Sequence, residues 1–112
     1  MQFEKRKNKR FSVSQFLSIT LEGEEFVAVS PKDISLGGLS CTTRVPVRPF
    51  TEVYLMISVP LPEGDEIIKI EGSVIHSTKD GEEYILGVKF LDLFESDKRK
   101  LEEYLKQLEE AE

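Results

Sequence analysis

Reactive and cross-linking side chains are scarce in this chain of 112 residues. Cys41 is the single cysteine and His76 the single histidine. One cysteine excludes an internal disulfide, and the two residues together exclude a His- or Cys-rich metal site built from one chain. Nucleophilic catalysis needs a positioned base, which a lone histidine in a strand-like stretch does not guarantee. The sequence therefore predicts a protein without catalytic residues, metal or cofactor.

Long apolar runs are also missing, as are internal repeats and low-complexity tracts. No segment could span a bilayer, and the charged start leads into no apolar stretch with a small-residue cleavage site. We therefore expect a cytoplasmic protein without membrane insertion. With 39% hydrophobic and 32% charged residues, the composition is that of a globular rather than a disordered chain. The length suits one domain with one core.

The formal net charge of −6 conceals an uneven distribution. Residues 1–10 carry five bases against one acid, whereas residues 95–112 carry seven acids against four bases. A nucleic-acid polymer would need basic residues along an extended face, so the pattern disfavours that partner and favours a small, local anion. A second interpretation stays open here, because a basic end can also be a solvated, mobile tail.

Alternating apolar and polar residues predict six short strands. These strands cover residues 11–21, 26–29, 39–44, 53–59, 67–76 and 84–90. We expect the second strand to end at Ser30-Pro31-Lys32-Asp33, because proline cannot donate to a ladder and aspartate favours turns. Closing the sheet on itself would remove its exposed edges. The expected fold class is therefore all-β, as a six-stranded antiparallel barrel rather than a compact sandwich.

One helix is predicted at the end of the chain, over residues 95–111. Ser96 is its candidate N-cap. Apolar side chains recur at three- and four-residue spacing along one face, at Leu101, Tyr104, Leu105 and Leu108. This stripe can cover the barrel or pair with a second copy of the chain.

Two arginines in the basic segment, Arg6 and Arg10, are candidate ligand-binding residues. A guanidinium can meet the O6 and N7 edge of guanine with two parallel hydrogen bonds, or stack on a purine. Lys5, Lys7 and Lys9 lie beside them and can attract phosphates. The Arg-x-x-x-Arg spacing also arises by chance in basic stretches, so this pattern alone does not identify a site.

The second candidate is the stretch Asp33-Ile34-Ser35-Leu36-Gly37-Gly38. Asp33 can accept hydrogen bonds from guanine, Ser35 can bond a base or a phosphate, and the glycines allow close backbone approach. The stretch is not a phosphate loop, because it lacks the Gly-x-x-x-x-Gly-Lys-Ser/Thr pattern and leads into a strand. The alternative is a plain connecting turn, in which the aspartate and serine bond their own backbone.

Together, Arg6-x-x-x-Arg10 and Asp33-x-Ser35-x-x-Gly38 resemble the signature of the PilZ domain, a bacterial receptor family for cyclic dimeric GMP (cyclic di-GMP). Residues 72–76 and 86–90 are also similar to the closing strands of that family. The resemblance implies a PilZ-type six-stranded antiparallel barrel with a C-terminal helix. It further implies a flexible switch segment, residues 1–10, which the ligand orders over a barrel domain of residues 11–112.

The resemblance also implies roles for single residues. The implied ligand-binding residues are Arg6, Arg10, Asp33, Ser35, Gly37, Gly38, Lys5 and His76. The arginines would grip guanine edges and phosphates, the aspartate and serine would read a guanine, and the glycines would permit backbone approach. His76 stands where many members have tryptophan, and an imidazole stacks less surface than an indole. Lys5 stands where many members have arginine and lacks its planar stacking, so the ligand stoichiometry stays open.

Three functional hypotheses follow from these observations. The first is a non-enzymatic cyclic di-GMP receptor whose ordered N-terminal segment alters contact with an unidentified downstream protein. The second is a PilZ-like adaptor that binds proteins without any ligand. The third, a small-barrel binder of RNA or single strands, is disfavoured by the net charge of −6 and by the few aromatics available for stacking.

Overall fold

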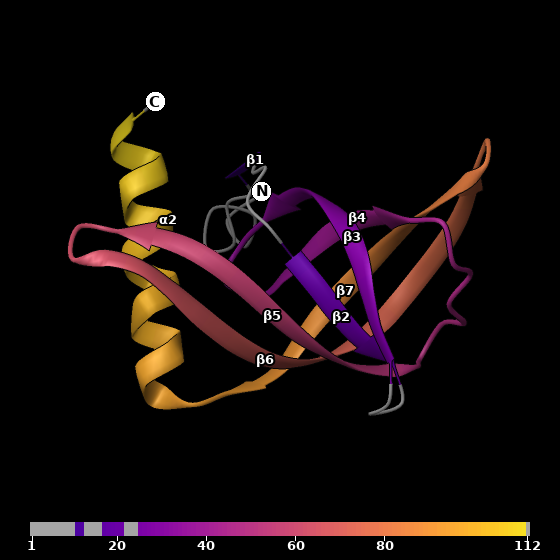
Figure 1. Ribbon diagram of the computed structural model, residues 1–112, viewed down its shortest axis with the longest axis horizontal. Coiled ribbons are helices and arrows are strands. Elements are labelled where there is room, and N and C mark those ends of the chain that lie inside the picture. Colours follow the sequence, from indigo (N-terminus) through magenta and orange to yellow (C-terminus); the bar gives the residue numbers. More distant parts are fainter. Residues whose placement is uncertain (1–10, 13–16, 22–24, 112) are drawn as a thin grey trace, which may run out of the picture.

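The computed structural model describes residues 11–12, 17–21 and 25–111, which form seven strands and one helix (Figure 1). In chain order these are β1 (Phe11–Ser12), β2 (Leu17–Leu21), β3 (Glu25–Ile34), β4 (Gly38–Thr43), β5 (Glu52–Leu61), β6 (Gly64–Asp80), β7 (Glu83–Leu93) and α2 (Glu95–Ala111). The first predicted strand, residues 11–21, corresponds to β1 and β2, and its residues 13–16 lie outside the described part.

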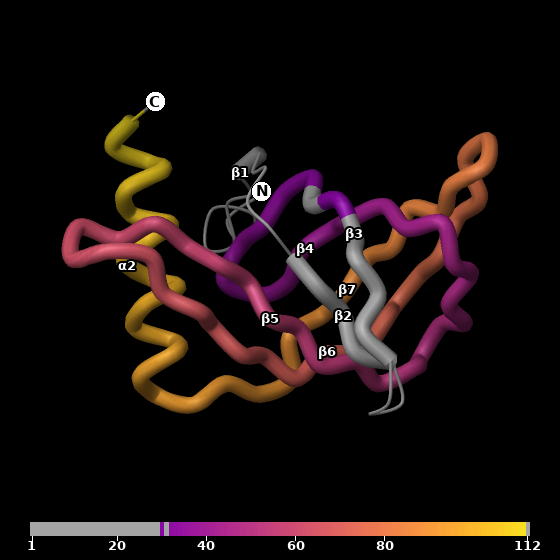
Figure 2. Tube along the Cα trace, viewed as in Figure 1, coloured from indigo at the N-terminus to yellow at the C-terminus, as the bar shows by residue number. Residues whose placement is uncertain are grey.

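The strands form one antiparallel sheet that closes on itself. Their order is β1-β3-β2-β5-β6-β7-β4, and an additional pairing of β3 with β4 joins the two sides. Strands β2 to β7 thus form a six-stranded barrel, and β1 adds a two-residue pairing at the end of β3. The predicted barrel with a C-terminal helix is confirmed. Figure 2 shows that the β5–β6 turn lies beside α2, whereas the β6–β7 turn lies at the opposite end.

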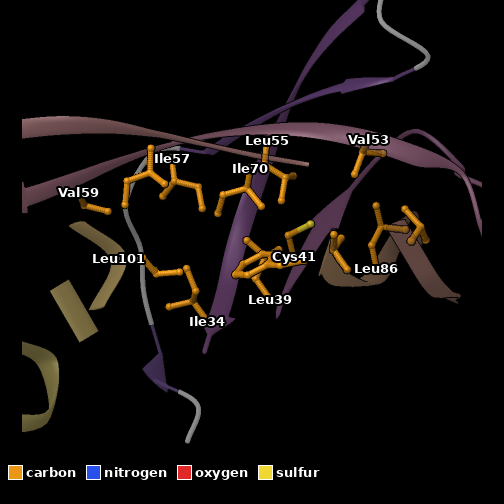
Figure 3. Close-up of a cluster of buried hydrophobic side chains, with 14 of the residues drawn as sticks. Ile34, Leu39, Cys41, Val53, Leu55, Ile57, Val59, Ile70, Leu86 and Leu101 are labelled. Atoms are coloured by element: carbon orange, nitrogen blue, oxygen red, sulfur yellow. The ribbon is translucent and has the colours of Figure 1, made fainter. Parts of the chain in front are cut away.

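The core fills the barrel through strict alternation along its strands. On β5, Val53, Leu55, Ile57 and Val59 are all buried, and the residues between them are exposed or half-buried. Figure 3 shows these side chains converging with those of β4 and β6. Cys41 lies fully buried among them, and this burial raises the pKa of its thiol to about 12. The single cysteine is therefore a protonated core side chain.

Helix α2 packs across the extended end of the β5–β6 hairpin. Its buried side chains are apolar apart from Asp97, and the helix is tied to the hairpin at two further points. The Gln107 side chain donates to the carbonyl of Pro60 at 2.9 Å, and Lys100 Nζ lies 3.1 Å from a carboxylate oxygen of Glu66. The apolar stripe of Leu101, Tyr104, Leu105 and Leu108 thus packs on the barrel core at this hairpin, which is the first of the two uses predicted for it.

Two local expectations were wrong. β3 does not end at Ser30 but runs to Ile34, because a register shift between Pro31 and Asp33 accommodates the proline within the ladder. Ser96 is not the N-cap, because the helix begins one residue earlier and its first hydrogen bond runs from Lys98 N–H to the Phe94 carbonyl, at 2.9 Å. The extension of β3 matters for function, since it carries Asp33 into the sheet.

Candidate functional site

The stretch from Asp33 to Gly38 forms the tight connection between β3 and β4. Ile34 pairs with Leu39, and the Ser35 N–H donates to the Gly38 carbonyl at 2.8 Å. The Ser35 side chain is 1% exposed, and its hydroxyl is engaged within the loop. The hydroxyl donates to the Gly38 carbonyl and accepts from the Gly37 N–H, each at 3.2 Å. In this structure Ser35 therefore shapes the loop, as the connecting-turn alternative describes.

Strand β7 fixes the position of this loop. The Gly37 carbonyl accepts a hydrogen bond from the Phe90 N–H at 2.9 Å. At Gly38, an added Cβ would overlap the backbone carbonyl of Val88, so only glycine fits between β4 and β7. The close approach at Gly38 is thus made to the protein's own backbone, while Gly37 is exposed at the surface.

The register of the sheet aligns four residues in one row across four strands. Asp33 on β3 pairs with Ser40 on β4, Ser40 pairs with Gly87 on β7, and Gly87 pairs with His76 on β6. Alternation places this row on the outer face, because its neighbours Leu39, Cys41, Leu86 and Val88 are all buried. We call this row, with Lys89, the platform.

His76 lies across the platform at Gly87. A Cβ built on Gly87 would overlap the Nε2, Cε1 and Cδ2 atoms of His76, so the imidazole ring lies directly over the glycine backbone. His76 is exposed on its other side. The imidazole therefore presents a flat, solvent-facing ring in the same row as Asp33, although it cannot cover as much of a base as an indole.

Sequence reasoning missed two platform residues. Lys89 is exposed and pairs with Gly38 on β4 and Ser73 on β6, next to the loop. Ser40 is half-buried between Asp33 and Gly87. For Lys89, the sequence did contain a signal. Residues 86, 88 and 90 of β7 are apolar and buried, so the alternation of the strand directs residues 87 and 89 outward. Lys89 supplies a cation beside the loop on a chain whose net charge is −6.

The predicted residues Lys5, Arg6 and Arg10 lie outside the described residues. The backbone that follows them is described, and β1 pairs Phe11 with Ile34 and Ser12 with Asp33. The chain that leaves Arg10 therefore enters the sheet beside the Asp33 end of the platform. The other predicted residues, Asp33, Ser35, Gly37, Gly38 and His76, all belong to the loop or the platform.

Residues 11–12, 17–21 and 25–111 contain no group of His, Cys, Asp and Glu side chains that could hold a metal ion. No helix in that part of the chain is long and apolar enough to cross a membrane.

Comparisons with known proteins agree with this architecture. The family model described as the PilZ domain matches residues 4–107. The chain is similar to the Bacillus subtilis inhibitor of motility MotI/DgrA, with 20% identity over 86% of this chain and 47% of that one, and a TM-score of 0.75. It is also similar to the PilZ domain of YcgR from Escherichia coli, solved with cyclic di-GMP, with 17% identity over 96% and 93% of the two chains and a TM-score of 0.70.

A third solved structure is the complex of K. pneumonia MrkH with cyclic di-GMP, at 24% identity over 92% of this chain and 51% of that one, with a TM-score of 0.67. The chain thus spans about half the length of the MotI/DgrA and MrkH chains. A comparison with curated protein sequences found no match. At these identities, the structural likeness shows a shared fold.

Proposed function

The chain belongs to the PilZ domain family, and on that premise we propose that it is a non-enzymatic receptor for cyclic di-GMP. One observation carries the proposal. The pairing of Ser12 with Asp33 brings the chain that follows Arg10 to the strand that carries the Asp-x-Ser-x-x-Gly loop. Residues 11–12, which directly follow the first half of the motif, thus pair beside the second half, more than twenty residues later in the sequence.

The platform offers chemistry that suits a cyclic dinucleotide. Such a ligand carries two guanines and two phosphates, so it needs hydrogen-bond acceptors, flat surfaces and cations close together. A carboxylate at Asp33 can accept from guanine N1–H and amino groups, and the ring of His76 offers a stacking surface. Lys89 can neutralise a phosphate, and Arg6 and Arg10 can grip guanine edges or phosphates from above.

Ser35 has a different role in this proposal from the one its residue type suggests. Because its buried hydroxyl bonds Gly37 and Gly38, it holds the loop in shape rather than reading a base. Ligand binding would order residues 1–10 over the platform, and the ordered segment would alter contact with a downstream protein in the cytoplasm. The similar PilZ domain of YcgR and the similar MrkH chain were both solved with cyclic di-GMP, which supports the choice of ligand.

The test is calorimetric titration of cyclic di-GMP into the purified chain, with GTP as the control ligand. We expect Arg10→Ala to abolish binding and Lys89→Ala to weaken it about tenfold, the equivalent of one lost charge-assisted hydrogen bond. Lys106→Ala removes the same charge from the exposed face of α2 and should bind as the wild type does.

Absence of heat from a folded wild-type chain would refute the receptor and favour the ligand-independent adaptor. Equal losses in Lys89→Ala and Lys106→Ala would refute the platform as the ligand surface, because net charge alone would then explain the effect.

A further inference from the structure

A second surface, distinct from the platform, lies where β5, β6 and β7 approach the start of α2. A groove of about 340 Å³ opens there. Its side chains include Tyr54, Met56, Lys69, Glu71, Asp92 and Phe94. The groove shares no residue with the platform, and Glu71 lies about 16 Å along β6 from His76, at about 3.3 Å per residue.

Two aromatic side chains stand exposed at this groove. Phe94 is 74% exposed and Tyr54 is 45% exposed. Both are held by rigid backbone, since Tyr54 lies within β5 and the Phe94 carbonyl accepts the first hydrogen bond of α2. Rigid aromatics beside a concave apolar surface are the usual anchors of protein–protein contacts.

The groove carries two carboxylates against one amine, Lys69, so acidic side chains are in excess there. Glu71 on β6 and Asp92 on β7 are direct register partners, and both are exposed. Among the residues that the structure describes, neither forms a salt bridge. Like charges placed opposite each other destabilise a sheet, and a cation brought between them would relieve that repulsion. Tyr54, the register partner of Glu71, adds an aromatic face that also attracts cations.

We propose that this groove docks a protein partner through a short segment in which a large apolar side chain stands next to an arginine or lysine. The apolar side chain would pack between Phe94 and Met56, and the cation would sit at Glu71 and Asp92. A second copy of the chain fits poorly, because a symmetric contact would bring the carboxylates of two acidic chains together. Anionic nucleotides are repelled by the same pair, so the groove is not a second ligand site.

The experiment is a selection of phage-displayed random short peptides on the immobilised full chain, followed by fluorescence anisotropy of the selected peptides. We expect an apolar residue within two positions of Arg or Lys in the selected peptides. Their affinity should fall at least tenfold for Glu71→Lys/Asp92→Lys and for Phe94→Ala, as is typical of hot-spot residues. The matched control is Glu82→Lys/Glu83→Lys, the same charge change at the β6–β7 turn, which lies at the opposite end of the barrel (Figure 1).

Other results would overturn the proposal. A basic partner segment would be excluded if the selection enriched no peptide or enriched acidic peptides. It would also be excluded if the selected peptides bound the charge-reversed variant as tightly as the wild type. A wild-type dimer in sedimentation that Phe94→Ala dissociates would assign the groove to a second copy. A synthetic peptide of residues 1–10 that binds the wild type but not the charge-reversed variant would assign it to the chain's own N-terminal segment. Cyclic di-GMP titration of the groove variants should match the wild type, which separates this proposal from the receptor function.

Discussion

At the scale of single residues, Phe50 is the clearest departure from ordinary backbone geometry. Its φ is +69°, a left-handed conformation that bulky side chains rarely adopt, and its side chain is 80% exposed. The conformation is held by neighbours, since the Phe50 N–H donates to the Val74 carbonyl and the Thr51 hydroxyl donates to the Arg48 carbonyl at 2.7 Å. The strain is thus imposed by the connection between β4 and β5 and is not offset by burial.

Phe50→Gly should therefore stabilise the protein. Removing the side chain from a left-handed residue raises the free energy of unfolding by about 1–2 kcal/mol. The greater freedom of glycine in the unfolded chain lowers it by about 0.5–1 kcal/mol. We expect a net gain of about 0.5–1 kcal/mol in the free energy of unfolding, measured by urea denaturation. Phe50→Ala is the matched control, because it removes the ring but keeps a Cβ, and it should give no gain. A loss of stability in Phe50→Gly would show that the exposed ring contributes packing.

At the scale of elements, α2 and the β5–β6 hairpin depend on each other. Leu101 is 1% exposed and belongs to the same core as the hairpin residues Val59 and Ile68. Leu101→Ala should lower the free energy of unfolding by about 2–5 kcal/mol, the usual cost of a large-to-small change in a core. Leu108→Ala, at a half-buried position on the same helix, should cost less than about 2 kcal/mol. Equal losses for the two variants would mean that the depth of burial against the hairpin does not set the stability of α2, because alanine is at least as good a helix former as leucine at both positions.

The elements also show what a sequence can and cannot predict. The strands and the helix follow from alternation and turn residues, which are local signals. The path of β3 through Pro31 does not, because the bulge that tolerates the proline depends on the partner strand β4. Ser96 is not the N-cap because the helix begins at Glu95, two residues after β7 ends at Leu93.

The candidate site also has a part that the sequence predicted and a part that it did not. The Asp-x-Ser-x-x-Gly loop was visible as a motif, since its residues are contiguous in the sequence. The row from Asp33 through Ser40 and Gly87 to His76 was not, because it depends on the register of four strands. The groove needs three strands and the end of β7 in one place, so nothing in the sequence alone joined Glu71 to Asp92 or Tyr54 to Phe94.

At the scale of the whole molecule, β6 and β7 connect the two surfaces. β6 carries His76 of the platform and Glu71 of the groove, and β7 carries Lys89 and Asp92. The platform carries one carboxylate, Asp33, and one amine, Lys89, whereas the groove carries two carboxylates and one amine, Lys69. The proposed dianionic ligand would therefore meet less repulsion at the platform than at the groove, whereas the proposed basic partner segment would be attracted to the groove. The same barrel can therefore hold both occupants without competition for residues.

If residues 1–10 act as a switch segment, ligand should stabilise the whole molecule through them. At about one hundred times its Kd, cyclic di-GMP should raise the free energy of unfolding by about 2.7 kcal/mol, because it binds the folded chain alone. It should also slow amide hydrogen exchange in the N-terminal segment, since ordering there is part of binding. In Arg6→Ala/Arg10→Ala, both effects should vanish, while stability without ligand stays within about 0.5 kcal/mol of the wild type, as is usual for surface substitutions. Denaturation and exchange with and without ligand measure this directly. The ligand could instead raise the free energy of unfolding without slowing amide exchange in residues 1–10. The platform would then bind the nucleotide without the N-terminal segment, and any change in partner binding would have to arise from the barrel surface.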